Sequence, residues 1–200
     1  MNTLRIFSTT LFISFAFLLT VLVGSASAAT WTEVEMGTAQ SLRGITGVGD
    51  QMVSVGNTGN LMYSTDSGLT WSLVDNFSNV WWLDAAVDTD GNFVAVGESG
   101  GYVESLDGGM TWDSISLGSS SRLNGVDFSD SYGYIVGEGG VGFSYSVNTS
   151  TWSSSTTNVT NNINAVYDQG DGTDWAVTDG GKLLYISSGG ASWSETATIS

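Results

Sequence analysis

The chain has 200 residues, of which 41% are hydrophobic and 12% aromatic, which is enough for a folded domain with its own core. It contains no cysteine and no histidine, which excludes a disulfide scaffold and a thiol nucleophile and removes the commonest general base and zinc ligand. Four Lys and Arg residues against 20 Asp and Glu give a net charge of −16, so nucleic acid and anionic lipid are not expected partners.

The first segment, residues 1–28, has the pattern of an export signal. One cation, Arg5, precedes an apolar stretch over residues 6–23, and small residues follow at Ala26–Ser27–Ala28. An uncleaved membrane anchor is the alternative, although the unbroken apolar run is shorter than the about 20 residues that a span needs. The pattern predicts an exported protein: secreted, periplasmic or at the cell surface. Cleavage leaves three cations and a net charge of −17.

The rest of the chain, residues 29–200, is repetitive. Tryptophan recurs at positions 31, 71, 112, 152 and 193, at steps of 40, 41, 40 and 41 residues. The repeat units run over residues 37–77, 78–118, 119–158 and 159–200, and a leading piece over residues 30–36 is left as an extra N-terminal strand.

Each unit predicts four short strands. In the first unit they are expected over 42–48, 51–55, 60–64 and 70–74, because β-branched and aromatic residues there are separated by Gly, Asn and Asp. A repeat of about 40 residues with four strands is typical of a β-propeller blade. The predicted fold is therefore all-β, a propeller of four four-stranded blades in a small or partial ring.

The turn before the last strand of the first two units reads S-x-D-x-G-x-T-W, which resembles the Asp-box, or BNR repeat. Its carboxylate is expected to accept hydrogen bonds from its own turn, and its tryptophan to pack on the neighbouring sheet, so we interpret it as structural and not catalytic. The residues are Ser64, Asp66, Gly68, Trp71, Ser105, Asp107, Gly109 and Trp112. The third and fourth units are one residue shorter in this turn and one longer in the preceding strand, so those blades should be less regular.

The whole unit, with L-x-x-V, then VG-x-x-G, then S-x-D-G-G-x-T-W, resembles the repeat of the photosystem II stability and assembly factor family. The resemblance covers residues 30–200 and implies an exported, non-enzymatic scaffold that binds a protein client, in that family a membrane protein. Members of that family usually close a ring with more blades than the four encoded here. Three alternatives remain open: a closed ring of four blades, a partial ring completed by self-association, and an incomplete gene.

A carbohydrate-active protein is the competing class, because sialidases also carry Asp-boxes. A sialidase resemblance requires three arginines, and only Arg43 and Arg122 follow the export segment, so this class is rejected. A lectin-like binder would use Trp81 and Trp82. Another glycoside hydrolase would use the carboxylate pair Glu98 and Glu138, which are otherwise ordinary solvated turn residues.

The repeat also predicts which residues meet at one end of the propeller. Equivalent positions at or beside the start of the innermost strands carry two arginines, a tryptophan pair and polar residues, and Trp and Arg are typical interface anchors. We therefore predict a docking face for a protein or peptide client, consisting of Arg43, Trp81, Trp82, Asp84, Arg122, Asn124, Glu98 and Glu138. The structural alternative is an ion pair between Arg43 and Asp84, with Trp82 as packing.

Two acidic loops, residues 88–92 and 168–174, have the oxygen-rich composition of calcium loops. Neither has a later bidentate Glu at EF-hand spacing, and Asp and Gly simply make turns at such positions. The sequence therefore predicts no metal site, and no motif for a cofactor is present.

Overall fold

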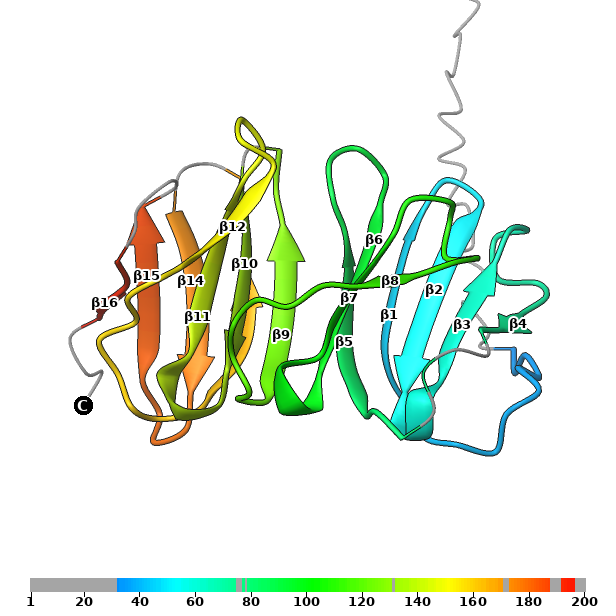
Figure 1. Ribbon diagram of the computed structural model, residues 1–200, viewed down its shortest axis with the longest axis horizontal. Coiled ribbons are helices and arrows are strands. Elements are labelled where there is room, and N and C mark those ends of the chain that lie inside the picture. The colour runs from blue at the N-terminus through cyan, green and yellow to red at the C-terminus, as the bar shows by residue number, and fades with distance from the viewer. Residues whose placement is uncertain are drawn as a thin grey trace, which may run out of the picture. The chain divides into compact units, whose positions relative to one another are not determined.

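A computed structural model describes residues 32–74, 77, 79–130, 132–170, 173–187 and 192–196 (Figure 1). The chain divides into two compact units, residues 1–33 and 34–200, and the second is described here. The predicted export segment lies outside the described residues, as does Trp31.

The second unit consists of four antiparallel sheets of four strands, each in sequence order (Figure 1). The first contains β1 (Leu42–Val48), β2 (Gln51–Gly56), β3 (Leu61–Ser64) and β4 (Ser72–Leu73). The second contains β5 (Trp82–Val87), β6 (Phe93–Gly97), β7 (Tyr102–Ser105) and β8 (Asp113–Ser114). The third contains β9 (Leu123–Phe128), β10 (Tyr132–Gly137), β11 (Gly142–Ser146) and β12 (Thr151–Ser154). The fourth contains β13 (Ile163–Tyr167), β14 (Thr173–Thr178), β15 (Leu183–Ser187) and β16 (Ser194–Glu195). The prediction of four four-stranded propeller blades is confirmed.

Of two further predictions about strands, the one on strand length is confirmed and the one on an extra N-terminal strand is wrong. The third strands of the last two sheets, β11 and β15, have five residues where β3 and β7 have four, as the longer strand segment predicted. The extra N-terminal strand expected over residues 30–36 is wrong for its described part, because residues 32–36 belong to no strand. They lie mostly exposed, without a neighbouring strand to complete a ladder.

Neighbouring sheets pack face to face through three apolar clusters. The first cluster joins Val53 and Val55 of β2 to Phe93 and Ala95 of β6. The second and third clusters repeat this arrangement between the later sheets. Every residue of β6 is buried, because its sheet is covered on both faces. Burial of such β-branched and aromatic side chains is the main stabilising contribution of the fold.

The innermost strands of neighbouring sheets approach each other at backbone distance. A Cβ atom on Gly44 of β1 would lie 3.1 Å from the Cα atom of Asp84 in β5. A Cβ atom on Gly125 of β9 would lie 3.2 Å from the Cα atom of Ala165 in β13. Small residues at these positions therefore set the spacing of the sheets near the propeller axis.

Among the described residues, no sheet covers the two outward faces of this four-sheet unit. The register-equivalent valines Val55, Val96 and Val136 are 0% exposed between sheets, whereas their counterpart Val177 in the fourth sheet is 46% exposed. On the opposite side, Ile45 of β1 is 60% exposed, and its counterparts in β5 and β9 are buried. Among the described elements, β1 contacts β5, β5 contacts β9 and β9 contacts β13, but the first and fourth sheets make no comparable contact. The sheets therefore form an open arc.

The turns before β4 and β8 are closed by their own side chains. The Oδ1 atom of Asp66 accepts the backbone N–H of Thr70 at 2.8 Å, and its Oδ2 atom accepts the Thr70 hydroxyl at 2.6 Å. These bonds from Thr70, with one from Ser64, lower the pKa of Asp66 to about 2. Asp107 makes the same bonds to Thr111. Both carboxylates therefore accept hydrogen bonds from their own turns through both oxygen atoms.

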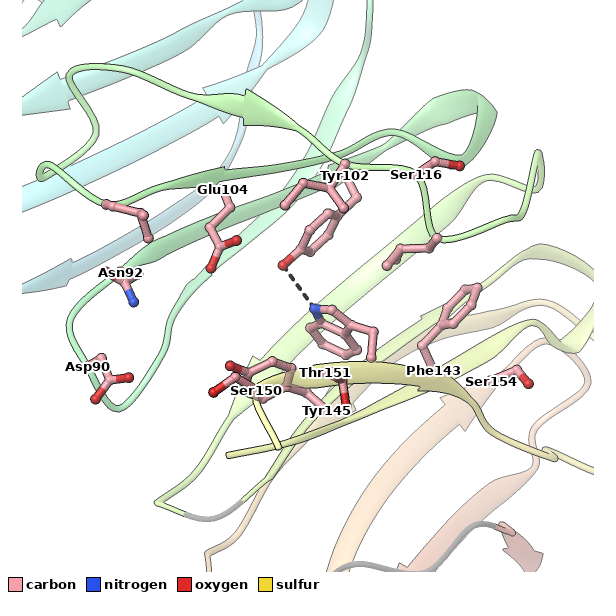
Figure 2. A pocket seen from close by; sticks show the side chains of 14 residues that line it. Asp90, Asn92, Tyr102, Glu104, Ser116, Phe143, Tyr145, Ser150, Thr151 and Ser154 are labelled. Carbon is pink, nitrogen blue, oxygen red and sulfur yellow. Dashed lines mark hydrogen bonds between the residues drawn. The ribbon is translucent and has the colours of Figure 1, made fainter. Parts of the chain in front are cut away.

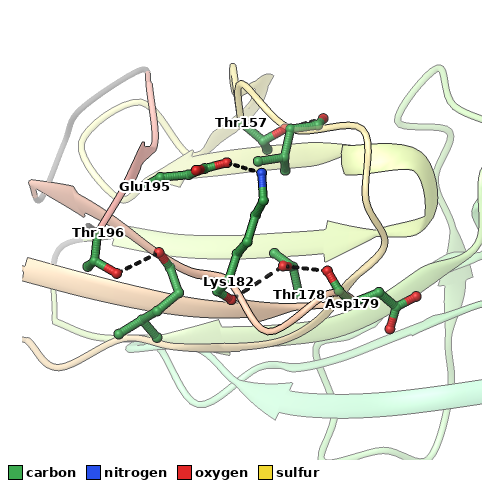
Figure 3. A network of polar contacts seen from close by, with 8 residues as sticks. Thr157, Thr178, Asp179, Lys182, Glu195 and Thr196 are labelled. Atoms are coloured by element: carbon green, nitrogen blue, oxygen red, sulfur yellow. Dashed lines mark hydrogen bonds and ion pairs between the residues drawn. The ribbon is translucent and has the colours of Figure 1, made fainter. Parts of the chain in front are cut away.

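Polar contacts stabilise the outer strands of the fourth sheet and the turn between β14 and β15 (Figure 3). The Nζ atom of Lys182 pairs with Oε1 of Glu195 at 2.5 Å, and the Thr196 hydroxyl donates to the carbonyl of Leu183 at 3.2 Å. The Thr178 hydroxyl donates to the carbonyl of Lys182 at 3.3 Å. Lys182, one of three cations that follow the export segment, is thereby engaged within its own sheet.

Candidate functional site

The starts of the four innermost strands surround one groove of about 470 Å³, here called the central groove. Each sheet contributes to it, and its lining side chains are two leucines, two arginines and two asparagines. They are Leu42, Arg43, Leu83, Arg122, Asn124 and Asn164. Of the predicted docking face, the structure thus brings Arg43, Arg122 and Asn124 together.

Arg43 is held in place at the edge of this groove. Its Nε atom donates to Oδ1 of Asn57 at 2.5 Å, and its guanidinium carbon lies 5.4 Å from the ring centroid of Trp81. Trp81 is 39% exposed, so a cation and an aromatic side chain are offered together to a ligand. Arg43 forms no ion pair with any described residue, and the pair with Asp84 that the sequence allowed is not made.

Trp82 and Asp84 do not belong to an exposed docking face. Trp82 is 2% exposed and packs edge-on against Phe77, with ring centroids 5.7 Å apart. Asp84 accepts the backbone N–H of Ala85 at 2.9 Å and that of Val126 at 3.1 Å. Burial raises the pKa of Asp84, although these two hydrogen bonds act in the opposite direction. Asp84 therefore joins the second sheet to the third.

The side chain of Arg122 is exposed, whereas that of Asn124 makes a hydrogen bond between two sheets. The Nδ2 atom of Asn124 donates to the carbonyl of Ile163 at 2.9 Å, which links β9 to β13. In the fourth sheet, Asn162 and Asn164 both donate to the carboxylate of Asp179, at 2.9 and 2.8 Å. The two arginines are therefore the charged side chains that line the central groove.

Of the predicted carboxylate pair, Glu138 lines a described groove and Glu98 does not. Glu98 and Glu138 begin equivalent single-turn 3-10 segments, η2 (Glu98–Gly100) and η3 (Glu138–Gly140), which match η1 (Asn57–Gly59) in the first sheet. Glu138 lines a groove beside residues 154–158, to which Glu98 does not contribute. These positions resemble ordinary turn residues.

Acidic side chains of the two predicted loops accept hydrogen bonds from the backbone of their own turns. Oδ1 of Asp88 accepts the backbone N–H groups of Asp90 and Asn92 at 2.9 and 2.8 Å. Burial, and then the neighbouring Asp174 carboxyl, raise the pKa of Asp168 to about 6. In the part of the chain that the structure describes, no group of three or more acidic side chains is placed to hold a metal ion.

The predicted docking face left out three lining residues of the groove: Leu42, Leu83 and Asn164. Asn164 occupies the same repeat position as Arg43, and this equivalence was the available indication. Within the described residues, no helix is long and apolar enough to cross a membrane.

Comparison with known proteins shows the fold. No family model matches the chain, and no curated protein matches it. A structure of YCF48 bound to a D1 peptide matches with a TM-score of 0.66 at 15% identity, covering 84% of this chain and 56% of that one. YCF48 from Cyanidioschyzon merolae matches with a TM-score of 0.66 at 18% identity, covering 86% of this chain and 61% of that one.

An ancestral GH74 enzyme also matches, with a TM-score of 0.67 at 14% identity, covering 87% of this chain and 26% of that chain. This chain spans somewhat more than half the length of the YCF48 structures. The four four-stranded sheets define a β-propeller. The resemblance of this chain to the photosystem II stability and assembly factors is therefore a resemblance in fold as well as in sequence pattern.

Proposed function

We propose that this protein is an exported, non-enzymatic propeller scaffold that binds a protein client at the central groove. One observation carries the proposal. In a chain with 20 acids, two arginines converge on one groove, and one of them lies against the exposed ring of Trp81. Such a group of Arg and Trp side chains is typical of the energetic centre of a protein interface. The fold likeness to YCF48 bound to a D1 peptide supports a peptide segment, including one of a membrane protein, as the client.

The fold likeness to a GH74 enzyme supports the carbohydrate alternative, a lectin-like binder or a glycoside hydrolase. The separation of Glu98 from the groove beside Glu138 weighs against a catalytic pair. Of the two tryptophans that a lectin-like binder would use, Trp81 is exposed and Trp82 is buried. The scaffold is therefore the better-supported function.

The test uses random displayed peptides selected on the purified protein, with affinity measured by fluorescence anisotropy. The double variant Arg43→Glu/Arg122→Glu should weaken the selected peptides roughly tenfold or more. Lys182→Glu is the matched control, because it changes a charge outside the central groove. Equal affinity for the double variant and the wild type would overturn the groove as the docking site. Hydrolysis of a polysaccharide panel that Glu98→Gln abolishes would establish the enzyme alternative instead.

We further infer that the two uncovered faces of the arc associate with a second copy. Ile45 lies on one end face and Val177 on the other, and their counterparts inside the arc are buried against a neighbouring sheet. A second copy supplies the matching half of this repeated contact at both ends. Light scattering should give twice the monomer mass, and Ile45→Asp or Val177→Asp should give a folded monomer. A wild-type monomer at every concentration tested would refute the association.

A further inference from the structure

The tryptophan of the third sheet departs from the arrangement in the second sheet. The indole Nε1 of Trp112 donates to the carbonyl of Gly109 in its own turn, at 2.9 Å. The third sheet lacks the equivalent turn residues, and Nε1 of Trp152 donates instead to the phenol oxygen of Tyr102 in the second sheet, at 2.9 Å (Figure 2). The tryptophan of the third sheet therefore bonds across to the second sheet and not to its own turn.

At this position a groove of about 730 Å³ lies between the second and third sheets, and we call it the interblade groove. Aromatic rings form one part of its wall. Trp152 lies edge-on to Tyr102 with centroids 5.8 Å apart, and tilted to Tyr145 with centroids 5.2 Å apart. Phe143 extends this aromatic wall.

Carboxylates lie on another part of the wall. Figure 2 shows Glu104 beside Tyr102, with Asp90 and Asn92 on the neighbouring loop. Glu104 is half-buried and receives no hydrogen bond from any described residue. Burial, with the nearby charges of Asp88 and Asp113, raises the pKa of Glu104. The carboxylate is thus partly desolvated and has two charges of its own sign nearby.

No cation of the described chain compensates this charge. The residues that line the interblade groove include neither Lys nor Arg. Arg43 and Arg122 line the central groove, and Lys182 is paired with Glu195. Aromatic faces together with an uncompensated, half-buried carboxylate suit an organic cation, because ring faces and carboxylates both attract positive charge.

We propose that the interblade groove binds an organic cation, an ammonium or guanidinium group, between the ring of Trp152 and the carboxylate of Glu104. An anion is repelled by the carboxylates. A neutral sugar gains ring stacking alone and leaves the charge of Glu104 unmatched. The site is separate from the central groove and of opposite charge.

The test follows the indole N–H signal of Trp152 by NMR on the labelled protein, assigned with Trp152→Phe. Choline represents a free ammonium ligand and Nα-acetyl-lysine amide one carried by a peptide. Their neutral isosteres are 3,3-dimethylbutanol and Nα-acetyl-norleucine amide. A saturable shift with either cation and not with its isostere is expected, and the tighter of the two identifies the source of the ligand.

Glu104→Gln should weaken this binding roughly fivefold or more, because the attraction to a half-buried carboxylate is lost. Asp130→Asn removes an exposed carboxylate that does not line the groove and should leave the affinity unchanged. The folded state of each variant is checked by the remaining indole signals. No shift with either cation, equal shifts with the neutral isosteres, or equal weakening by both variants would overturn the proposal.

Discussion

Asp84 and Val126 join two sheets through a side chain and a backbone group: Oδ2 of Asp84 accepts the Val126 N–H at 3.1 Å. Asp127 makes a comparable contact one sheet further on, at a different register position, where its Oδ2 accepts the N–H of Asp168 at 3.0 Å. These acids of the innermost strands are therefore links between sheets.

Asp84→Ala should lower the free energy of unfolding by about 1–3 kcal/mol, because the buried Val126 N–H loses its acceptor. Asp84→Asn keeps an acceptor oxygen and removes a buried charge, so a smaller loss is expected. Urea unfolding measures both variants. Equal losses would show that the charge of Asp84, and not its hydrogen bond, matters.

The tryptophans of the two Asp-containing turns should differ in their contribution to stability. Trp112 is buried in the cluster between the first two sheets, and Trp112→Ala should cost about 3–5 kcal/mol. Trp71 makes the same bond to its own turn but is only half-buried and belongs to none of the three clusters. Trp71→Ala should cost clearly less in the monomer, measured by thermal unfolding. Equal costs would indicate that another sheet covers Trp71.

Asp168 should make the protein more stable in mild acid. Burial raises its pKa from 3.8 to about 6, so its contribution to stability is fully present below pH 3.8 and is lost as the pH rises through about 6. Unfolding should therefore require on the order of 1 kcal/mol more at pH 5 than at pH 7.5.

Asp168→Asn should flatten this part of the pH profile and stabilise the protein at pH 7.5, because no charge remains to be desolvated. Asp130→Asn removes an exposed carboxylate and serves as the control for the general fall in negative charge. A profile that changes equally in both variants would assign the effect to net charge.

Gly125 should not tolerate a larger residue. A Cβ atom added there would lie 3.2 Å from the Cα atom of Ala165, and a valine must move the innermost strands apart, at about 1–3 kcal/mol. Gly125→Ala should cost less than Gly125→Val, as judged by the urea midpoint. No difference between the two would mean that the sheets separate freely at this point.

The fold was predictable from the sequence because each blade repeats the same strands and Gly-rich turns. The docking face was less predictable from the sequence. The strand register makes Trp82 the counterpart of the core residues Leu123 and Ile163, at a position followed by the same register shift in all four sheets. Gly101 leaves room for the ring of Trp82, since a Cβ there would lie 3.2 Å from it, and this glycine replaces Asn60 and Val141 of the neighbouring repeats. The replacement was the available indication that Trp82 is packed.

The interblade groove was not predictable for a different reason. The shortened turn indicated an irregular third blade, and that was correct for its strand lengths. The new partner of Trp152, the phenol of Tyr102, lies 50 positions away in the sequence. No local pattern encodes such a contact between two sheets.

The width of the central groove is fixed by two close backbone approaches, Gly44 to Asp84 and Gly125 to Ala165. The side chains that line the groove do not determine its width. The chemistry of the groove can therefore diverge one side chain at a time, at the equivalent positions 43, 83, 124 and 164, on an unchanged frame. Under the proposed docking function, relatives that keep these glycine and alanine positions would differ in the clients they bind, and the residues at these four positions would sort them.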